Sequence, residues 1–250
     1  MIGEIVIPAR LASTRLPEKL LLCETGKTVL EHTYFACQNA KLPKGITVAV
    51  DHRQLFEVVQ KFGGLAVMTD VNAQSGTDRI AEVAHARPEV DVFINVQGDE
   101  PEIEGSSIDK VMELLQNNPM ADVATLATPI RSKSDLEDPA CVKVVCGHDG
   151  MALYFSRSVI PHPRSWDDSL LHAQPPCFLQ HLGIYAYRRD FLLRLAELPW
   201  SPLEQIEKLE QLRFLQAGRR IVVGVVDKSP RGIDTREDYE AFKLRRFASY

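Results

Sequence analysis

The sequence predicts an α/β protein with a mostly parallel sheet. Short apolar runs rich in β-branched residues recur along the chain, and most gaps between them can hold a helix. The run 92–96 is apolar at nearly every position, which is typical of a strand covered on both faces. The predicted strands are 5–7, 46–50, 65–68, 92–96, 123–127 and 221–226.

Helical periodicity supports this fold class. After Thr28, the side chains of Val29, Thr33 and Cys37 fall on one face of a helix. The segment after Asp51 repeats the pattern with Leu55, Val58, Val59 and Phe62. A third helix is predicted over 203–217, with Gly218 placed to end it. Its apolar stripe has steps of three and consists of Leu203, Ile206, Leu209, Leu212 and Leu215.

The length of 250 residues suits a single α/β domain that spans residues 1–250. Within it the pattern changes at about 141–187, where the strand-like runs 142–146, 153–155 and 184–187 surround a proline-rich loop at 161–176. We interpret this range as an insertion. We expect it to cover the substrate or to pair with a second subunit.

Composition excludes several classes of protein. Apolar residues make up 45% and charged residues 25%, which is ordinary globular usage. The net charge of −5 disfavours a nucleic-acid surface, so a polyanion must bind a local basic cluster. The five cysteines form an odd set without a C-x-x-C pair, which indicates reduced thiols and a cytoplasmic location. The apolar stretch after Met1 stops at Arg10, so we expect no signal peptide.

A basic loop follows the first predicted strand. It carries Arg10, Arg15 and Lys19, where ligands bind in open α/β sheets. Arginine binds two phosphate oxygens at once and lysine acts as a point charge, so this mixture suits a triphosphate. The alternative is a solvated surface loop.

Residues 26–28, Gly-Lys-Thr, resemble the end of a phosphate-binding P-loop. The spacing fails, because the motif requires glycine at the position of Leu21. We therefore interpret the segment as a turn that leads into the next helix. A second polar turn, 74–79, opens a helix whose free N–H groups could meet a base or a phosphate. Its alternative is structural, with Thr77 as the helix cap.

Two carboxylates are candidate metal ligands. Asp99 follows the strand 92–96 after a glycine that permits a sharp turn, and Mg²⁺ needs only one or two carboxylates plus phosphate oxygens. Glu100 is expected to point away from the ion. Asp234 precedes the last predicted helix, where its alternative is a capping box formed by Asp234 or Thr235. An acidic turn is the alternative at Asp99.

Together these motifs resemble the 3-deoxy-manno-octulosonate (Kdo) cytidylyltransferases. The first basic block is shared with other nucleotidyltransferases, whereas the blocks at 154–157 and 202–213 are particular to this family. The resemblance runs from Ile5 to about Asp238. The matching blocks are 7–10, 12–17, 74–79, 95–101, 142–145, 152–157, 181–185, 201–213 and 234–235.

The resemblance implies a Rossmann-like nucleotide-diphospho-sugar transferase fold, a homodimer, Mg²⁺, and transfer of CMP from CTP to the anomeric hydroxyl of Kdo for lipopolysaccharide synthesis. It makes Lys19, Arg10 and Asp99 catalytic, and Asp99 and Asp234 metal ligands. The implied nucleotide-binding residues are Ala9, Arg10, Arg15, Lys19, Ser75 and Gln97, and the implied sugar-binding residues are Gln97, Arg157, His181, Tyr185, Glu210 and Gln211.

Two segments depart from the family pattern, and several other functions compete. Residues 138–141, Asp-Pro-Ala-Cys, replace a more usual Asn-Pro-Asn run, a difference that we expect to be structural. Glu18 stands where the family usually has glycine before the lysine. A cytidylyltransferase acting on 8-amino-Kdo or an N-acylneuraminate would share the triphosphate loop. A glycosyltransferase on this fold usually carries an Asp-x-Asp motif, which Pro101 rules out at Asp99. A catalytically dead nucleotide-binding regulator conflicts with the intact Lys19, Asp99 and Asp234.

Overall fold

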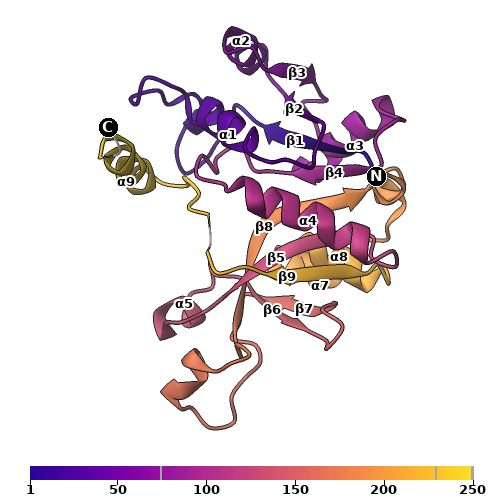
Figure 1. Cartoon of the computed structure of the whole chain (residues 1–250), viewed down its shortest axis with the longest axis vertical. Coiled ribbons are helices and arrows are strands. Elements are labelled where there is room, and N and C mark those ends of the chain that lie inside the picture. The colour runs from indigo at the N-terminus through magenta and orange to yellow at the C-terminus, as the bar shows by residue number, and fades with distance from the viewer. Residues whose placement is uncertain (74, 229, 249–250) are drawn as a thin grey trace.

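A computed structural model describes residues 1–73, 75–228 and 230–248. Its strands form one sheet in the order β3-β2-β1-β4-β8-β5-β9, from which the β6–β7 hairpin branches at β8 (Figure 1). The prediction of a mostly parallel sheet is confirmed. Only β8 runs antiparallel to its neighbours β4 and β5 in the main path of the described sheet. The strands are β1 (Gly3–Ala9), β2 (Gly45–Val50), β3 (Leu65–Met68), β4 (Val92–Asn95), β5 (Val123–Pro129), β6 (Lys143–Cys146), β7 (Ala152–Ser156), β8 (Leu179–Arg188) and β9 (Ile221–Val225).

Helices cover both faces of this sheet. Ile5 and Ile7 of β1 pack into one apolar cluster with α1 and α4, while Val6 between them packs into a second cluster with α3, α6 and α8. This alternation explains why the strands are apolar throughout. The helices are α1 (Val29–Cys37), α2 (Arg53–Lys61), α3 (Gly76–Ala86), α4 (Gly105–Asn117), α5 (Lys133–Glu137), α6 (Arg189–Leu192), α7 (Pro202–Glu207), α8 (Gln211–Gln216) and α9 (Arg236–Phe247), with 3₁₀ turns η1 (Lys19–Leu21), η2 (Asp168–His172) and η3 (Leu195–Glu197).

The single helix predicted over 203–217 is wrong. The structure divides it into α7 and α8, because Lys208 adopts a left-handed conformation with φ of 54°. This break turns the apolar stripe, so that Leu209 and Leu212 are buried whereas Ile206 is 79% exposed. Gly218, with φ of 73°, ends the segment as predicted.

The structure also revises the extent of the predicted insertion at 141–187. The second half of β8 lies in the centre of the main sheet, where Ala186 pairs with Ile94 on one side and Ala124 on the other. The β6–β7 hairpin pairs with the first half of β8, through Lys143 and Val144. The segment between β7 and β8 extends away from the sheet, at the bottom of Figure 1.

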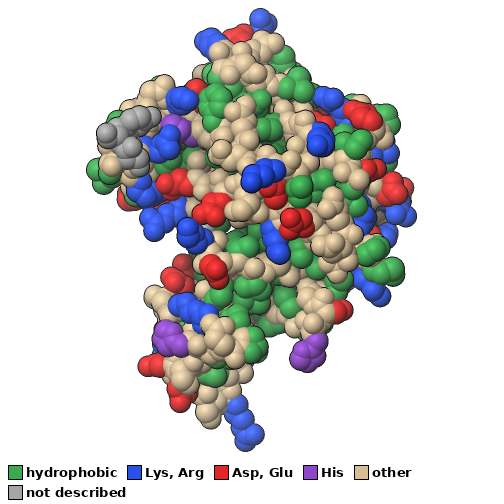
Figure 2. Space-filling model, viewed as in Figure 1, with side chains coloured by type: hydrophobic (Ala, Val, Ile, Leu, Met, Phe, Trp, Pro, Cys, Tyr) green, Lys and Arg blue, Asp and Glu red, His purple; other side chains and the backbone are tan. Residues whose placement is uncertain are grey.

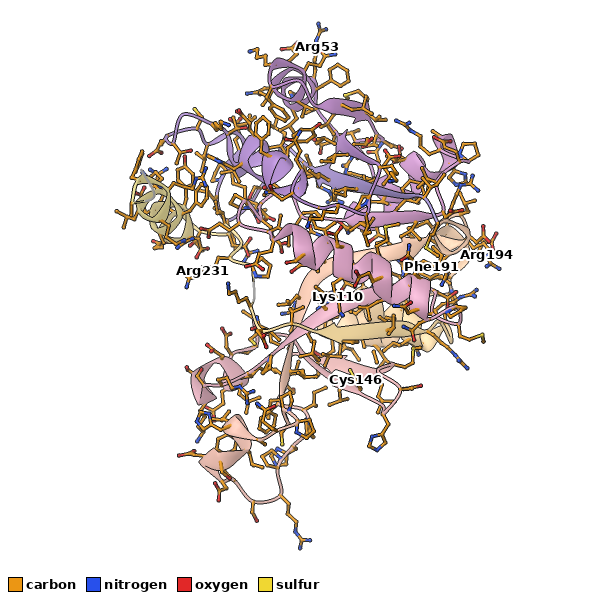
Figure 3. The ribbon with its side chains drawn as sticks, viewed as in Figure 1. Arg53, Lys110, Cys146, Phe191, Arg194 and Arg231 are labelled. Atoms are coloured by element: carbon orange, nitrogen blue, oxygen red, sulfur yellow. The ribbon has the colours of Figure 1, made fainter. Side chains whose placement is uncertain are left out.

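The mixture of charges on the surface agrees with the net charge of −5. Acidic and basic side chains are interspersed over the face shown in Figure 2. At the periphery, Arg53 and Arg194 point away from the sheet (Figure 3). Among the described residues, every helix is too short or too polar to cross a bilayer.

Candidate active site

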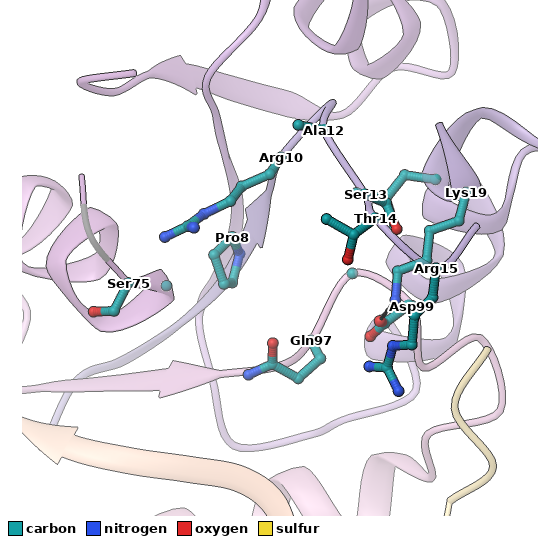
Figure 4. Close-up of a pocket in the computed structure, with 13 residues that line it drawn as sticks. Pro8, Arg10, Ala12, Ser13, Thr14, Arg15, Lys19, Ser75, Gln97 and Asp99 are labelled. Atoms are coloured by element: carbon teal, nitrogen blue, oxygen red, sulfur yellow. Dashed lines mark hydrogen bonds and ion pairs between the residues drawn. The ribbon is translucent and has the colours of Figure 1, made fainter. Parts of the chain in front are cut away.

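The candidate site lies where the carboxyl ends of β1 and β4 meet. These strands are adjacent and parallel, so Arg10 and Gln97 leave the sheet at the same edge. A cavity of about 410 Å³ opens there. Figure 4 shows Arg10 and Ser75 on one side of the hollow and Asp99 on the other, with Gln97 between them. The lining residues are Pro8, Arg10, Ala12, Ser13, Thr14, Arg15, Lys19, Leu20, Ser75, Gly76, Gln97, Gly98 and Asp99.

The basic loop is anchored by its leucines. Leu16 and Leu20 are 8% and 6% exposed and belong to the same apolar cluster as β1. Between them the backbone turns at Glu18, whose φ of 51° and ψ of 31° lie in the left-handed region. That conformation suits the glycine that is usual at this position in the resembling family. The turn sets Lys19 at the start of η1, facing the acidic residues.

Lys19 joins the two predicted metal ligands. Its ammonium contacts the Asp99 carboxylate and lies 3.0 Å from the Asp234 Oδ1 atom. The Asp234 Oδ1 atom also accepts a hydrogen bond from Arg15 at 2.9 Å. Burial by itself lowers the pKa of Lys19, but the charge and hydrogen bonds of Asp99 and Asp234 outweigh it, so that the pKa is raised. Lys19 is therefore a fixed positive charge at neutral pH.

The position of Asp234 is set by its neighbours. The Ile233 N–H donates to the Asp99 carbonyl oxygen at 2.9 Å, which places Asp234 beside Asp99. Thr235 is the N-cap of α9 and forms a capping box with Asp238. Because Thr235 supplies the cap, the Asp234 carboxylate is free to face Lys19. Of the two capping alternatives, the structure selects Thr235.

Glu100 is buried beside this cluster. Burial, together with the charges of Asp99 and Asp234, raises the pKa of Glu100 to about 8. Its Oε2 atom has no hydrogen-bond partner among the described residues. The described chain also contains no group of three or more His, Cys, Asp or Glu side chains able to hold a metal ion. Burial therefore favours the protonated form of Glu100 over its carboxylate.

The start of α3 forms another wall of the cavity. The structural alternative for this turn, in which Thr77 caps the helix, is wrong. Ser75 is the N-cap and forms a capping box with Asp78, because its hydroxyl accepts a hydrogen bond from the Asp78 N–H at 3.1 Å. Thr77 is the second residue of the helix and is 2% exposed. Gln74, the first residue of the predicted polar turn, lies outside the described residues.

The segment 26–28 is a turn, as predicted. Gly26 has φ of 85°, and the Thr28 hydroxyl caps α1 by accepting a hydrogen bond from the Glu31 N–H at 3.1 Å. Lys27 is half exposed and lies over the ring of Phe35. None of these three residues lines the cavity that Arg10 and Lys19 share.

His181 and Tyr185, two of the predicted sugar-binding residues, lie together on β8. Their rings are 5.3 Å apart between centroids, and the His181 Nε2 atom lies 3.0 Å from the Thr125 hydroxyl. Burial lowers the pKa of His181 to about 3, so its imidazole is neutral at physiological pH. A β-bulge in β8 opposite Thr125 and Leu126 separates the two residues along the strand.

Glu210 and Gln211 occupy the start of α8, and Arg157 follows β7. The guanidinium of Arg157 donates to the Glu207 carbonyl oxygen at 2.7 Å and to the Pro139 carbonyl oxygen at 3.0 Å. Glu210 is bound by Arg213 at 3.2 Å. None of the predicted sugar-binding residues except Gln97 lines the cavity described above.

Sequence reasoning missed a buried ion pair that shapes the nucleotide side. Arg79 is 1% exposed, lies 3.3 Å from Asp51, and donates to the Thr69 hydroxyl at 2.7 Å. Asp51 also accepts a hydrogen bond from the Leu11 N–H at 3.0 Å and donates its own N–H to Ala9. Ala9, predicted to bind nucleotide, is itself fully buried in β1. Because Arg79 and Asp51 are 28 residues apart, no local motif indicates this pair.

Comparisons with known proteins identify the family. The model of the cytidylyltransferase family matches residues 5–221. The 3-deoxy-manno-octulosonate cytidylyltransferase of Rhodopirellula baltica is 54% identical over 242 residues, covering 96% of this chain and 97% of that protein. The corresponding protein of Syntrophotalea carbinolica is 44% identical over 235 residues, covering 93% and 94%. The chain belongs to the 3-deoxy-manno-octulosonate cytidylyltransferase family.

Solved structures agree with this family and with the predicted fold class. A CMP:2-keto-3-deoxy-manno-octonic acid synthetase complexed with CTP has a TM-score of 0.92 and 40% identity, with complete coverage of both chains. A 4-diphosphocytidyl-2C-methyl-D-erythritol synthase from Anaerococcus prevotii has a TM-score of 0.62 at 14% identity, covering 98% and 97%, and shows the shared fold alone. This chain covers nearly the whole length of the two cytidylyltransferases named above, 97% and 94%.

In this cytidylyltransferase, the basic loop and the acidic turn converge although they are far apart in sequence. Arg10, Arg15 and Lys19 come from the loop after β1, and Asp99 comes from the turn after β4. Asp234 joins them from the linker before α9. The individual roles predicted for these side chains stay predictions.

Proposed function

We propose that this enzyme transfers CMP from CTP to the anomeric hydroxyl of Kdo and releases pyrophosphate. The observation that carries the proposal is the Lys19 ammonium held by Asp99 and Asp234 at the edge of the cavity. Its support from relatives is the 54% identity to a protein named for this activity. A solved relative with the same fold is complexed with CTP.

The geometry suits phosphoryl chemistry that needs alignment and charge neutralisation. The anomeric oxygen forms a bond to the α-phosphorus, and the bond from that phosphorus to the α–β bridging oxygen breaks as pyrophosphate leaves. Arg10 and Arg15 offer planar donors to the triphosphate, and Lys19 supplies a positive charge that is only 15% exposed. Because the ammonium is shielded from water, its electrostatic attraction to phosphate oxygens is stronger than that of a fully solvated charge.

The residues also fit a magnesium ion. Oxygens of Asp99 and Asp234 converge on the single ammonium of Lys19, so both carboxylates face one point in space. Two carboxylates plus phosphate oxygens and waters form a ligand set that Mg²⁺ accepts. When bound, the ion would neutralise phosphate charge. Lys19 holds the two carboxylates in place by their hydrogen bonds.

The test is a pyrophosphate-release assay with CTP and a panel of Kdo, 8-amino-Kdo and N-acetylneuraminate, with Mg²⁺ present or chelated. We expect Kdo to give the highest kcat/KM and chelation to abolish release. Asp99→Asn, which keeps the side-chain shape, should lose most of the turnover. Absence of pyrophosphate release with all three sugars would refute the proposal. The homodimer, the cytoplasmic location and the role in lipopolysaccharide synthesis stay predictions.

A further inference from the structure

A row of buried polar side chains connects the predicted nucleotide side to the predicted sugar side. It begins at Thr77, whose hydroxyl donates to the Glu210 Oε2 atom at 2.6 Å. Thr77 is 2% exposed, and Glu210 is held on its other oxygen by Arg213 at 3.2 Å. Since Ser75 supplies the cap of α3, the Thr77 hydroxyl is not needed there.

The row continues from Thr77 toward the triphosphate cavity. The Tyr187 hydroxyl lies 3.5 Å from the Thr77 hydroxyl and is also hydrogen-bonded to the Asn95 side chain. Asn95 in turn accepts a hydrogen bond on its Oδ1 atom from the Gln97 Nε2 atom at 3.3 Å. Tyr187 and Asn95 are 1% and 3% exposed, so both side chains are shielded from bulk solvent. Four elements of the fold, β4, β8, α3 and α8, meet along this row.

Two links of the row have a defined direction. The Thr77 hydroxyl donates to Glu210, and the Gln97 Nε2 atom donates to the Asn95 Oδ1 atom. Between them the Tyr187 hydroxyl lies 3.5 Å from the Thr77 hydroxyl, where either oxygen could donate, and is hydrogen-bonded to the Asn95 side chain. Because Gln97 donates to Asn95 through its nitrogen, its Oε1 atom is turned toward the cavity, as Figure 4 shows. The row thus links the Gln97 amide to a carboxylate that lies 113 residues away in the chain.

We propose that Asn95, Tyr187 and Thr77 form a positioning relay that orients Gln97 and Glu210 together. The inference rests on the proposed function and on the predicted roles of Gln97 at the nucleotide and the sugar and of Glu210 at the sugar. The relay makes the sugar-side carboxylate and the cavity amide a single preorganised unit. Thr77, Asn95 and Tyr187 act through the residues they hold and do not touch the reacting atoms.

The experiment compares Thr77→Val with Thr77→Ser. Valine keeps the shape of threonine without the hydroxyl, whereas serine keeps the hydroxyl. Thr47→Val is a matched control, because the Thr47 hydroxyl also donates to a buried carboxylate, that of Glu4 at 2.5 Å, far from the cavity. For Thr77→Val we expect KM for the sugar acid to rise about tenfold, with KM for CTP within twofold. Thr77→Ser and Thr47→Val should retain both values within about threefold.

A second measurement needs no substrate. The side-chain amide of Gln97, assigned in ¹⁵N-labelled protein with a Gln97→Glu variant, should shift in Tyr187→Phe and Thr77→Val but not in Thr47→Val. Unchanged Gln97 resonances, or equal sugar KM values for Thr77→Val and Thr47→Val, would overturn the relay. If the wild-type protein releases no pyrophosphate, the proposed function fails by itself. The resonance shifts still decide the relay in that case.

Discussion

Replacing Lys19 by methionine removes the charge on which the acidic cluster converges. The ammonium is 15% exposed, contacts Asp99, and lies 3.0 Å from Asp234. Because its pKa is raised by these two carboxylates, against the effect of burial, the group is charged throughout the working pH range. Loss of one preorganised charge of this kind costs about 10² to 10³ in kcat, or about 2.7 to 4 kcal/mol. We therefore expect Lys19→Met to fold and to turn over at that reduced rate.

The assay is pyrophosphate release at saturating CTP and Kdo, with unfolding in urea measured in parallel. Lys133→Met serves as a matched control, because Lys133 is 54% exposed in an i,i+4 pair on α5. Such surface pairs contribute about 0.3 to 0.5 kcal/mol, so this control should keep full turnover. Turnover of Lys19→Met within threefold of the wild type would refute the role of Lys19. A loss explained entirely by unfolding would refute it as well.

Two further predictions concern the basic loop and the pH dependence of stability. Glu18→Gly should raise the free energy of unfolding, measured in urea, by up to about 1 kcal/mol. A non-glycine residue in the left-handed conformation costs about 1–2 kcal/mol, and part of this gain is offset because glycine loses more backbone entropy on folding. Glu18→Ala, which keeps the Cβ atom, should gain less, and a destabilised Glu18→Gly would contradict the strain argument. The free energy of unfolding should also fall as the pH drops below 6.5, the ordinary pKa of a histidine. Burial lowers the pKa of His181 in the folded protein to about 3, so between pH 6.5 and pH 3 the unfolded chain binds more protons than the folded chain. The loss from this histidine is at most about 1.4 kcal/mol per pH unit, and His181→Gln should flatten the dependence between pH 7 and 5, whereas an unchanged slope would argue against a buried neutral imidazole.

Much of the fold follows from local patterns. The strands at 65–68 and 92–96 and the helix after Thr28 were predicted from apolar periodicity, and the structure confirms them within a residue or two. The place of β8 was missed, because it enters the sheet antiparallel between β4 and β5. An apolar run predicts a strand but does not say which neighbours it pairs with.

The prediction of a single helix over 203–217 fails for a different reason. Its stripe at steps of three favoured one helix, yet the Ser156 hydroxyl and the Arg157 N–H bind the Glu207 carboxylate at 2.6 and 2.9 Å. The turn at Lys208 follows directly. The end of α7 is therefore bound by residues at the end of β7, about 50 residues earlier in the chain. Apolar periodicity within 203–217 does not predict such a distant contact.

The sequence by itself determined the α/β class, the basic loop and the family. These depend on the order of residues within short segments, where backbone preferences and strand ends act locally. Only the tertiary structure decided that Lys19, Asp99 and Asp234 share one point, and that Thr77 holds Glu210 rather than capping α3. Hydrogen bonds of about 3 Å depend on how distant elements pack, and a threonine in the sequence looks the same whether its hydroxyl caps a helix or binds a carboxylate.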